Sequence, residues 1–231
     1  MKESMRNKTV LVIGGGKYGS QACRHLKEQM ARVILVDKNP DCLAHEIVAR
    51  EDFIVKDARD AWELALRIKP EFTVPTHPGH TFGIWLAECF QLESHPDPLQ
   101  KVMGRLPHSL ILNFDETNAA IIASYMPQGK LCKEDCPPFR RKCTLTNEPR
   151  PAPLNRLLEY AIFELFDCAR IFATETIAPG IGGIRTSDIT TFMQEINSRT
   201  PRTLAVGIAC ECHGALSLFK TKNGIEEMHT I

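Results

Sequence analysis

Short apolar stretches alternate with amphipathic stretches along the chain, a pattern that is typical of α/β proteins. The apolar runs are rich in valine, isoleucine and leucine, as buried strands are. They predict strands at residues 9–13, 32–37, 53–56, 71–75, 109–114, 170–174, 203–208 and 215–220. Apolar residues at helical spacing predict helices at residues 20–30, 40–49, 60–68, 82–92, 115–125, 155–168 and 187–198. The pattern predicts a Rossmann-like parallel sheet followed by a smaller C-terminal α/β part.

A glycine cluster separates the first predicted strand from the first predicted helix, in the segment TVLVIGGGKYG at residues 9–19. Gly14, Gly16 and Gly19 have the G-x-G-x-x-G spacing, and Gly15 is an additional glycine inside it. In dinucleotide-binding units the first glycine permits a tight turn, the second lets the backbone approach a pyrophosphate, and the third lets helix and strand pack closely. The diphosphate binds the N–H groups at the start of the helix. The alternative is an α/β core in which these glycines only make a turn.

Asp37 ends the second predicted strand, RVILVD at residues 32–37. A carboxylate at this position accepts hydrogen bonds from an adenosine ribose and would repel the 2′-phosphate of NADP. Asp37 therefore favours NAD(H), although the adjacent Lys38 weakens the discrimination. Strand, glycines, helix and terminal acid occur in the order that a nucleotide-binding βαβ unit requires.

The segments VLVIGGGKYG and VDKNPDCLAHE resemble the Rossmann nucleotide-binding domains of the potassium-transport regulator type. In that family an acidic residue closes the second strand and a short Asp-Ala follows the third, as Asp57 does in FIVKDA. The IGGG opening is also similar to the dehydrogenase domain of sirohaem synthases. These resemblances cover about the first sixty to ninety residues and imply binding of NAD or a related nucleotide. The residues implied are Gly14, Gly16, Gly19 and Asp37, with Asp57 near the adenine.

Two histidines follow the predicted strand at residues 71–75, in the segment THPGHT. Ligands of open α/β sheets bind beyond the carboxyl ends of the strands. His77 or His80 could act there as a general acid or base, because imidazole titrates near neutral pH. A turn with a capping or solvent-exposed histidine explains the segment equally well.

The nine cysteines are many for a cytosolic chain, in which reducing conditions disfavour disulfides. Cys23, Cys42, Cys89 and Cys168 lie in helical patterns among apolar neighbours, which is typical of buried core thiols. The other five fall into two compact sets, so metal or redox chemistry becomes the question that they raise.

The two sets are a proline-rich segment at residues 128–153 and the motif CECH after the strand at 203–208. Their cysteines are Cys132, Cys136 and Cys143 in the first and Cys210 and Cys212 in the second. Thiolates bind zinc and iron–sulfur clusters, so these five are predicted metal ligands if the fold brings the sets together. We favour an iron–sulfur cluster, since electron transfer suits a chain with a dinucleotide site. Zinc and reduced thiols without a metal are the alternatives, and a role of His213 as a ligand is left open.

Charge and hydropathy limit the classes of function. The chain has 28 basic and 28 acidic residues, a formal charge of zero and a pI of about 7.1, which argues against a general nucleic-acid binder. The polar start MKESMRNK and the lack of a run of about 18 apolar residues predict a cytoplasmic protein without membrane insertion.

Taken together, these patterns predict an NAD(P)-binding redox protein, an oxidoreductase with a cysteine-bound iron–sulfur or zinc centre. The alternative is a nucleotide-sensing regulatory module with a structural zinc site, and whether the chain is an enzyme stays open. A tetrapyrrole dehydrogenase or chelatase is a third interpretation. The expected partners are a dinucleotide, a redox partner protein for the enzyme, and further copies of the chain in a homo-oligomer. We predict a Rossmann-like domain at residues 1–127 and a cysteine-containing α/β domain at residues 128–231.

Overall fold

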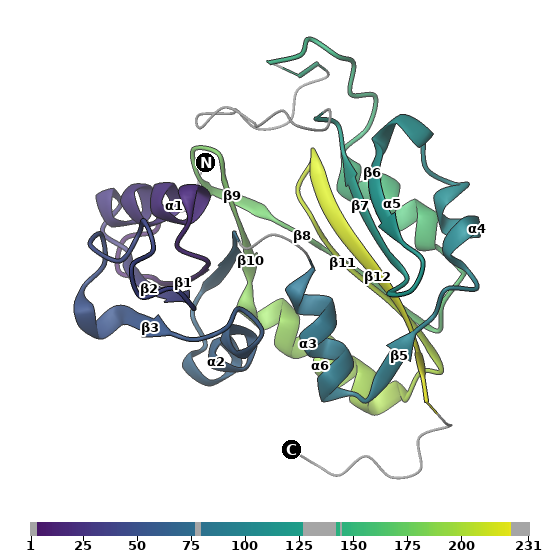
Figure 1. Cartoon of the computed structure of the whole chain (residues 1–231), viewed down its shortest axis with the longest axis horizontal. Coiled ribbons are helices and arrows are strands. Elements are labelled where there is room, and N and C mark those ends of the chain that lie inside the picture. Colours follow the sequence, from purple (N-terminus) through teal and green to yellow (C-terminus); the bar gives the residue numbers. More distant parts are fainter. Residues whose placement is uncertain (1–3, 77–79, 127–141, 144, 223–231) are drawn as a thin grey trace. The chain divides into compact units, whose positions relative to one another are not determined.

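The protein is described by a computed structural model that places residues 4–76, 80–126, 142–143 and 145–222. Over these residues it is a mixed α/β structure with two mixed sheets and six α-helices (Figure 1). Its contacts define two compact units, each described here by itself. Unit 1 holds the described residues of Met1–Phe82 and Thr174–Thr190, and unit 2 those of Gly83–Cys132, Pro138–Ala173 and Thr191–Ile231. This division by contacts differs from the predicted one after residue 127.

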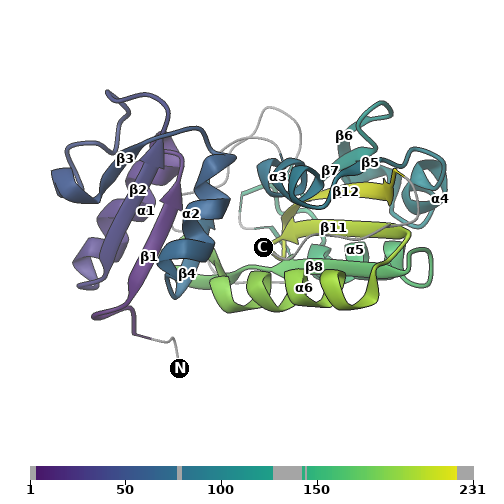
Figure 2. The ribbon, with the colours of Figure 1, turned by 90° about the horizontal axis from the view of Figure 1, so that it is seen from below.

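Unit 1 contains a six-stranded sheet in the order β3-β2-β1-β4-β10-β9. Four strands are parallel, and β2, β1 and β4 lie side by side (Figure 2). They are β1 (Thr9–Ile13), β2 (Arg32–Asp37), β3 (Phe53–Val55) and β4 (Phe72–Pro75), and they confirm the four strands predicted in this region. β9 (Glu175–Ala178) and β10 (Ile181–Arg185) pair in antiparallel fashion, and β10 is antiparallel to β4. The sheet is therefore mixed, whereas a parallel sheet was predicted.

The helix α1 (Lys17–Glu28) covers one face of the sheet in unit 1. Its buried residues Ala22, Cys23 and Leu26 pack against the alternate positions of β1 and β2 that point to this side. The intervening positions Leu11 and Ile13 are also fully buried. Burial of both faces explains the continuous apolar pattern of β1.

The predicted helix at residues 40–49 is wrong, because this segment consists of turns. Its polar groups bond locally and to the glycine loop instead of forming a helix. The Asn39 side chain accepts the Asp41 N–H at 3.0 Å, and the Ala44 N–H donates to the Gly15 carbonyl at 3.1 Å. Asparagine competes with helix formation through such side-chain bonds. Two further helical elements follow, η1 (Arg50–Asp52) and α2 (Asp60–Ile68), the second as predicted.

The segment that returns to unit 1 late in the sequence is held by contacts between β4 and β10. A buried hydrogen bond of 3.0 Å joins the hydroxyls of Thr73 and Thr186. The Arg185 guanidinium lies over the Phe72 ring, 4.8 Å from its centroid, and is paired with Glu71 and Glu175. The contacts of Thr186 with Thr73 and of Arg185 with Phe72 and Glu71 join residues more than a hundred positions apart in the sequence.

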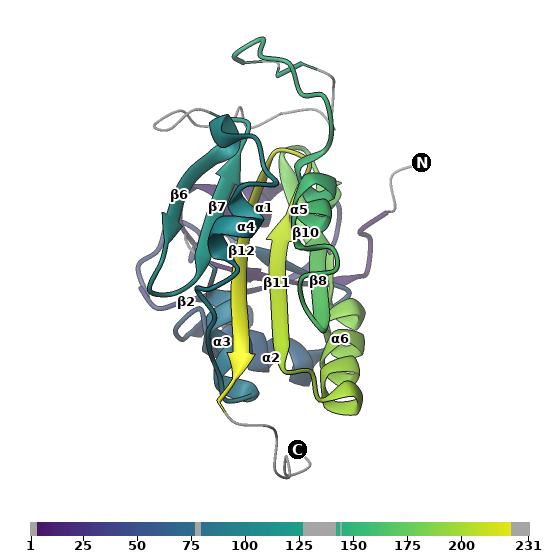
Figure 3. The same ribbon diagram turned by 90° about the vertical axis from the view of Figure 1, so that its right-hand side faces the viewer.

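Unit 2 contains a second sheet in the order β6-β7-β12-β11-β8, with β5 paired to β12. Its strands are β5 (Leu92–Ser94), β6 (Ile111–Asp115), β7 (Ala120–Ser124), β8 (Cys168–Ala173), β11 (Thr203–Ala209) and β12 (His213–Thr221). β11 and β8 are parallel and the other pairs antiparallel, and β7, β12, β11 and β8 lie side by side in Figure 3. The predicted helix at residues 115–125 is wrong. The Asp115 carboxylate accepts the Asn118 N–H at 2.9 Å, which closes a turn from β6 into β7.

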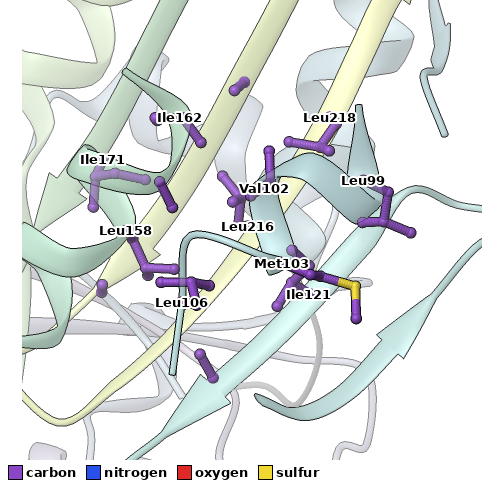
Figure 4. Packing of buried hydrophobic residues seen from close by; sticks show 14 of the residues in the cluster. Leu99, Val102, Met103, Leu106, Ile121, Leu158, Ile162, Ile171, Leu216 and Leu218 are labelled. Carbon is purple, nitrogen blue, oxygen red and sulfur yellow. The ribbon is translucent and has the colours of Figure 1, made fainter. Parts of the chain in front are cut away.

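Helices cover both faces of the strand β8. On one face α4 (Leu99–Met103) and α5 (Leu154–Ile162) enclose a core with Ile171 (Figure 4). On the other face Phe172 contacts Phe192 of α6 (Thr186–Arg199) edge to face, with ring centroids 5.5 Å apart. Together with α3 (Thr81–Cys89) and the 3-10 turn η2 (His108–Leu110), these helices complete the described elements. None of the described helices has the length and apolar character needed to span a membrane.

The core of unit 2 provides a test of this packing. Leu158 on α5 is fully buried among residues of β7, β8 and β12, whereas Tyr160, two positions further along the same helix, is 65% exposed. Leu158→Ala should lower the free energy of unfolding by about 2–5 kcal/mol, because it leaves a cavity. Tyr160→Ala is the matched control and should change it by less than about 0.5 kcal/mol. Urea denaturation followed by circular dichroism measures both, and equal losses would contradict the packing.

Candidate functional site

The glycine loop in unit 1 connects β1 to α1 and depends on two of its glycines. Gly14 has a backbone φ of 101°, a left-handed conformation that favours glycine. A Cβ on Gly19 would lie 1.8 Å from the Gly14 carbonyl oxygen, so only glycine lets the helix approach the loop this closely. The Thr76 hydroxyl at the end of β4 donates to the same carbonyl at 2.8 Å. The first and third glycines thus have the structural roles expected of them.

Gly16 lies at the N-terminus of α1, where the loop is open. A Cβ on Gly16 would meet no atom of the described residues within 4 Å. Among these residues no side-chain hydrogen bond caps this end of the helix, and its first turn has no acidic residue and begins with Lys17. An anion at this position would meet the positive end of the helix dipole. The predicted approach of a pyrophosphate to the backbone at Gly16 stays a prediction.

Asp37 is brought directly to the glycine loop by the pairing of β1 with β2. Its Oδ2 accepts the Gly15 N–H at 2.5 Å, and its Oδ1 accepts the Asn39 N–H at 2.8 Å. The thiol of Cys42 also packs against Gly15, 2.2 Å from the position that a Cβ there would occupy. A carboxylate offers about four lone-pair sites, so each oxygen of Asp37 keeps acceptor capacity for a ribose hydroxyl.

Asp57 follows β3 and is engaged in its own turn. Its Oδ1 accepts the Arg59 N–H at 3.0 Å and lies 3.5 Å from the Arg59 guanidinium. The hydrogen bond from the Arg59 backbone is the main cause that lowers the pKa of Asp57, so the group is a carboxylate at neutral pH. The predicted contact of Asp57 with an adenine stays a prediction.

Of the two candidate catalytic histidines, the structure describes only His80. His77 lies outside the described residues. Burial lowers the pKa of His80 to about 4, and its ring lies 6.3 Å from that of Phe82. At neutral pH His80 is therefore uncharged and a weak base, which makes it a poor general acid and a modest general base.

In unit 2 the motif CECH forms the turn between β11 and β12. The Cys210 thiol receives the N–H groups of Cys212 at 3.3 Å and of His213 at 3.1 Å, and it lies 3.5 Å from His213 Nδ1. Neighbouring segments anchor this turn, because the Leu154 N–H donates to the Glu211 carbonyl and the Tyr125 N–H to the Cys212 carbonyl, both at 2.9 Å.

Cys143 has a turn of the same kind. Burial alone would raise the pKa of its thiol. Hydrogen bonds from the Thr146 hydroxyl and from the N–H groups of Thr146 and Leu145, together with the charge of Arg150, outweigh burial. The pKa of Cys143 is therefore lowered to about 7. In both turns a sulfur therefore accepts the backbone N–H groups two and three residues later. Such hydrogen bonds stabilise a thiolate.

Arg150 links the two cysteine segments. Its side chain is 2% exposed and donates to the Lys142 carbonyl at 3.3 Å and to the sulfur of Cys212. Its charge also acts on Cys143 and contributes, after burial, to the lowered pKa of His213. The fold thus brings Cys143 and the CECH turn to one guanidinium. Arg150 lies between two prolines and belongs to no motif, so sequence reasoning missed it.

The predicted metal site is tested only in part. Cys132 and Cys136 lie outside the described residues. Over the residues that the structure places, no three His, Cys, Asp or Glu side chains are grouped so that they could hold a metal ion. An iron–sulfur or zinc centre on Cys132, Cys136, Cys143, Cys210 and Cys212 therefore stays a prediction.

Comparison with known proteins matches both parts of the chain to one family. The family model AF_1314_N, described as the N-terminal domain of an uncharacterized protein, matches residues 10–81. The model AF_1314_C, the corresponding C-terminal domain, matches residues 82–222. An uncharacterized protein from Archaeoglobus fulgidus is 26% identical over 223 residues, which cover 91% of this chain and 98% of that protein.

These matches show that the resemblance to potassium-transport regulator domains is wrong. The resemblance depended on a glycine loop and on acids at strand ends. The packing of α1 on β1 by itself requires a glycine at position 19, because a Cβ there would collide with the Gly14 carbonyl. The matches extend along the whole chain, whereas the resemblance covered only its first part.

The glycine loop gives a paired prediction for stability. Gly19→Ala should lower the free energy of unfolding by at least about 2 kcal/mol, because the added methyl group collides with the backbone of Gly14. Gly16→Ala should cost less than about 1 kcal/mol, since the space is open and only the N-cap preference changes. Thermal unfolding of both variants is the measurement, and a larger loss for Gly16→Ala would show that the loop has another conformation.

Proposed function

The chain belongs to the AF_1314 family of uncharacterized proteins, and on this premise we propose that it is an oxidoreductase that binds NAD(H) on the glycine loop of unit 1. The observation that carries the proposal is the open helix N-terminus at Gly16 beside the carboxylate of Asp37. This combination offers a site for a pyrophosphate next to a site for a ribose.

The strand order supports a Rossmann-like arrangement of unit 1. β1 is linked through α1 to β2 on one side and has β4 on its other side, so the order reverses at β1. Ligands of open α/β sheets bind outside the carboxyl ends of the strands at such a switch point. Gly14 to Gly16 and Thr76 lie at this end of β1 and β4.

Asp37 supports NAD(H) in preference to NADP(H). Its Oδ2 is fixed by the Gly15 N–H, so the carboxylate is oriented before any ligand arrives. A 2′-phosphate on the ribose would be placed against this negative charge. Lys38 follows on the exposed side of the strand end and reduces the discrimination without removing it.

The redox chemistry in this proposal belongs to the nicotinamide, which accepts or donates a hydride. The residues of the chain would bind and orient the dinucleotide: Gly16 by close backbone approach and Asp37 by hydrogen bonds to the ribose. His80 is uncharged at neutral pH and a weak base, so it has no imidazolium proton to supply to a substrate.

Isothermal titration calorimetry with NAD(H) and NADP(H) tests the proposal. Gly16→Ala should weaken NAD(H) binding by roughly tenfold or more, because the methyl group occupies the space of the pyrophosphate. Gly104→Ala, a glycine of unit 2 with an ordinary backbone conformation, is the matched control and should bind as the wild type does. Asp37→Ala should weaken NAD(H) binding severalfold and narrow the preference over NADP(H).

Three outcomes separate the possibilities. No binding of either dinucleotide at millimolar concentration would refute the proposed site. Equal binding by the wild type and by Gly16→Ala would move the site away from the loop. Tight binding of NAD(H) by a protein that reduces and oxidises no substrate would instead favour a nucleotide-sensing module.

A further inference from the structure

We propose that Asp57 helps the nucleotide site to select NAD(H) over NADP(H), because it neutralises Arg59 and Lys38 where a 2′-phosphate would lie. Asp57 is then a second specificity-determining residue beside Asp37, and it acts through these two cations. The inference rests on the proposed nucleotide site and adds to it a source of its selectivity. It lies entirely within unit 1.

The pairing of β2 with β3 puts Asp57 at the same end of the sheet as Asp37. The two strands are parallel, Asp37 is paired with Val55, and the Lys56 N–H donates to the Asp37 carbonyl at 3.1 Å. Neighbouring strands of a sheet are about 4.8 Å apart. Lys38 and the turn that begins at Asp57 therefore leave the sheet at the same end as the carboxylate proposed to bind the ribose.

The Asp57 carboxylate interacts with both cations. Its Oδ1 accepts the Arg59 N–H at 3.0 Å and lies 3.5 Å from Arg59 Nε. The pKa of Asp57 is lowered first by this backbone hydrogen bond and then, against the opposing effect of burial, by the Arg59 guanidinium and by the charge of Lys38. Asp57 is therefore charged at neutral pH and offsets the charge of its two neighbours.

A ligand in solvent can reach all three groups. The side chain of Arg59 is 51% exposed and that of Asp57 46%, and Lys38 is exposed as well. A cation attracts a phosphate whichever other hydrogen bonds its side chain makes, because Coulomb attraction depends only on charge, distance and medium. A carboxylate beside the cation cancels much of this attraction. Asp57 therefore limits the loss of discrimination that Lys38 would cause.

The two carboxylates have different ways of acting in this proposal. Asp37 is fixed against the glycine loop by the Gly15 N–H at 2.5 Å and repels a 2′-phosphate directly. Asp57 acts by offsetting Arg59 and Lys38. The effect of removing the charge of Asp57 should therefore depend on these two cations, whereas the effect of removing that of Asp37 should not.

Adenosine 2′,5′-bisphosphate and 5′-AMP are the probes, because they differ only in the 2′-phosphate. Asp57→Asn removes the charge and keeps an oxygen that can accept the Arg59 N–H. In calorimetric titrations at about 0.1 M salt it should strengthen binding of the bisphosphate by about fivefold, the effect of one unit charge about 4 Å away in water. Binding of 5′-AMP should change by less than about twofold, and the gain should disappear at about 1 M salt, where charges are screened beyond about 3 Å.

Asp52→Asn is the matched control. Asp52 pairs with Arg32 at the opposite end of β2 through hydrogen bonds of 2.7 and 3.0 Å, so this change removes the same charge from the same edge of the sheet. It should leave binding of the bisphosphate as in the wild type, because about 16 Å of strand exceeds the screening length of about 10 Å at 0.1 M salt.

A second control removes the two cations. In a chain that carries Arg59→Gln and Lys38→Gln, the further change Asp57→Asn should alter the affinity for the bisphosphate by less than about twofold, since no charge is left for Asp57 to offset. The same fivefold gain in that chain would show that Asp57 repels the phosphate itself, which contradicts the proposed role.

The remaining outcomes separate this inference from the nucleotide site on which it rests. A wild-type protein that binds neither NAD(H) nor 5′-AMP would refute the site, and the role of Asp57 with it. A wild-type protein that binds NAD(H), combined with an unchanged affinity of Asp57→Asn for the bisphosphate, would refute the role of Asp57 alone. An equal gain from Asp52→Asn would do the same.

Discussion

The contact between the α-carbon of Gly19 and the carbonyl of Gly14 is the constraint on which the first unit depends. There is no room for a single methyl group between the two, so α1 begins directly over the end of β1. This close approach gives the loop its left-handed turn at Gly14 and places Gly15 against Asp37. The backbone geometry that this packing requires is also the geometry of the proposed nucleotide site, so a substitution at Gly19 would affect both.

In the second unit a buried cation, the guanidinium of Arg150, joins two distant segments of the chain. Arg150 is surrounded by protein, and its hydrogen bonds connect the segment after Lys142 with the turn between β11 and β12. Burying a guanidinium is costly unless its donors find acceptors, and here its two terminal nitrogens donate to a sulfur and to a carbonyl oxygen. Two cysteines of this region differ in acidity: burial raises the pKa of Cys210, whereas hydrogen bonds and the charge of Arg150 outweigh burial and lower the pKa of Cys143.

The period of the apolar residues and the spacing of the glycines predicted most strands and the glycine loop of unit 1. These features depend on residues that are close together in the sequence. The apolar runs of β1, β2, β4, β11 and β12 reflect burial on both faces, and the glycine spacing reflects steric contact. The failures have tertiary causes. Residues 115–125 have helical spacing, yet pairing with β6 and β12 makes Ala120–Ser124 a strand. The turns at residues 40–49 are held by a hydrogen bond to Gly15, far away in the sequence. The contact of Arg150 with Cys212 likewise joins residues about sixty positions apart, so neither feature had a local signal.

The discontinuity of unit 1 has a consequence for biosynthesis. β10 covers the edge of β4 only through residues that follow the whole of β5 to β8 in the chain. While the ribosome is still producing those residues, β4 presents unpaired backbone groups, and an exposed sheet edge is a template for wrong pairing. Closing so long a loop is also slow. The nascent protein therefore passes through a stage in which its first sheet is open on one side, and during that stage the cell's chaperones are the available protection against aggregation.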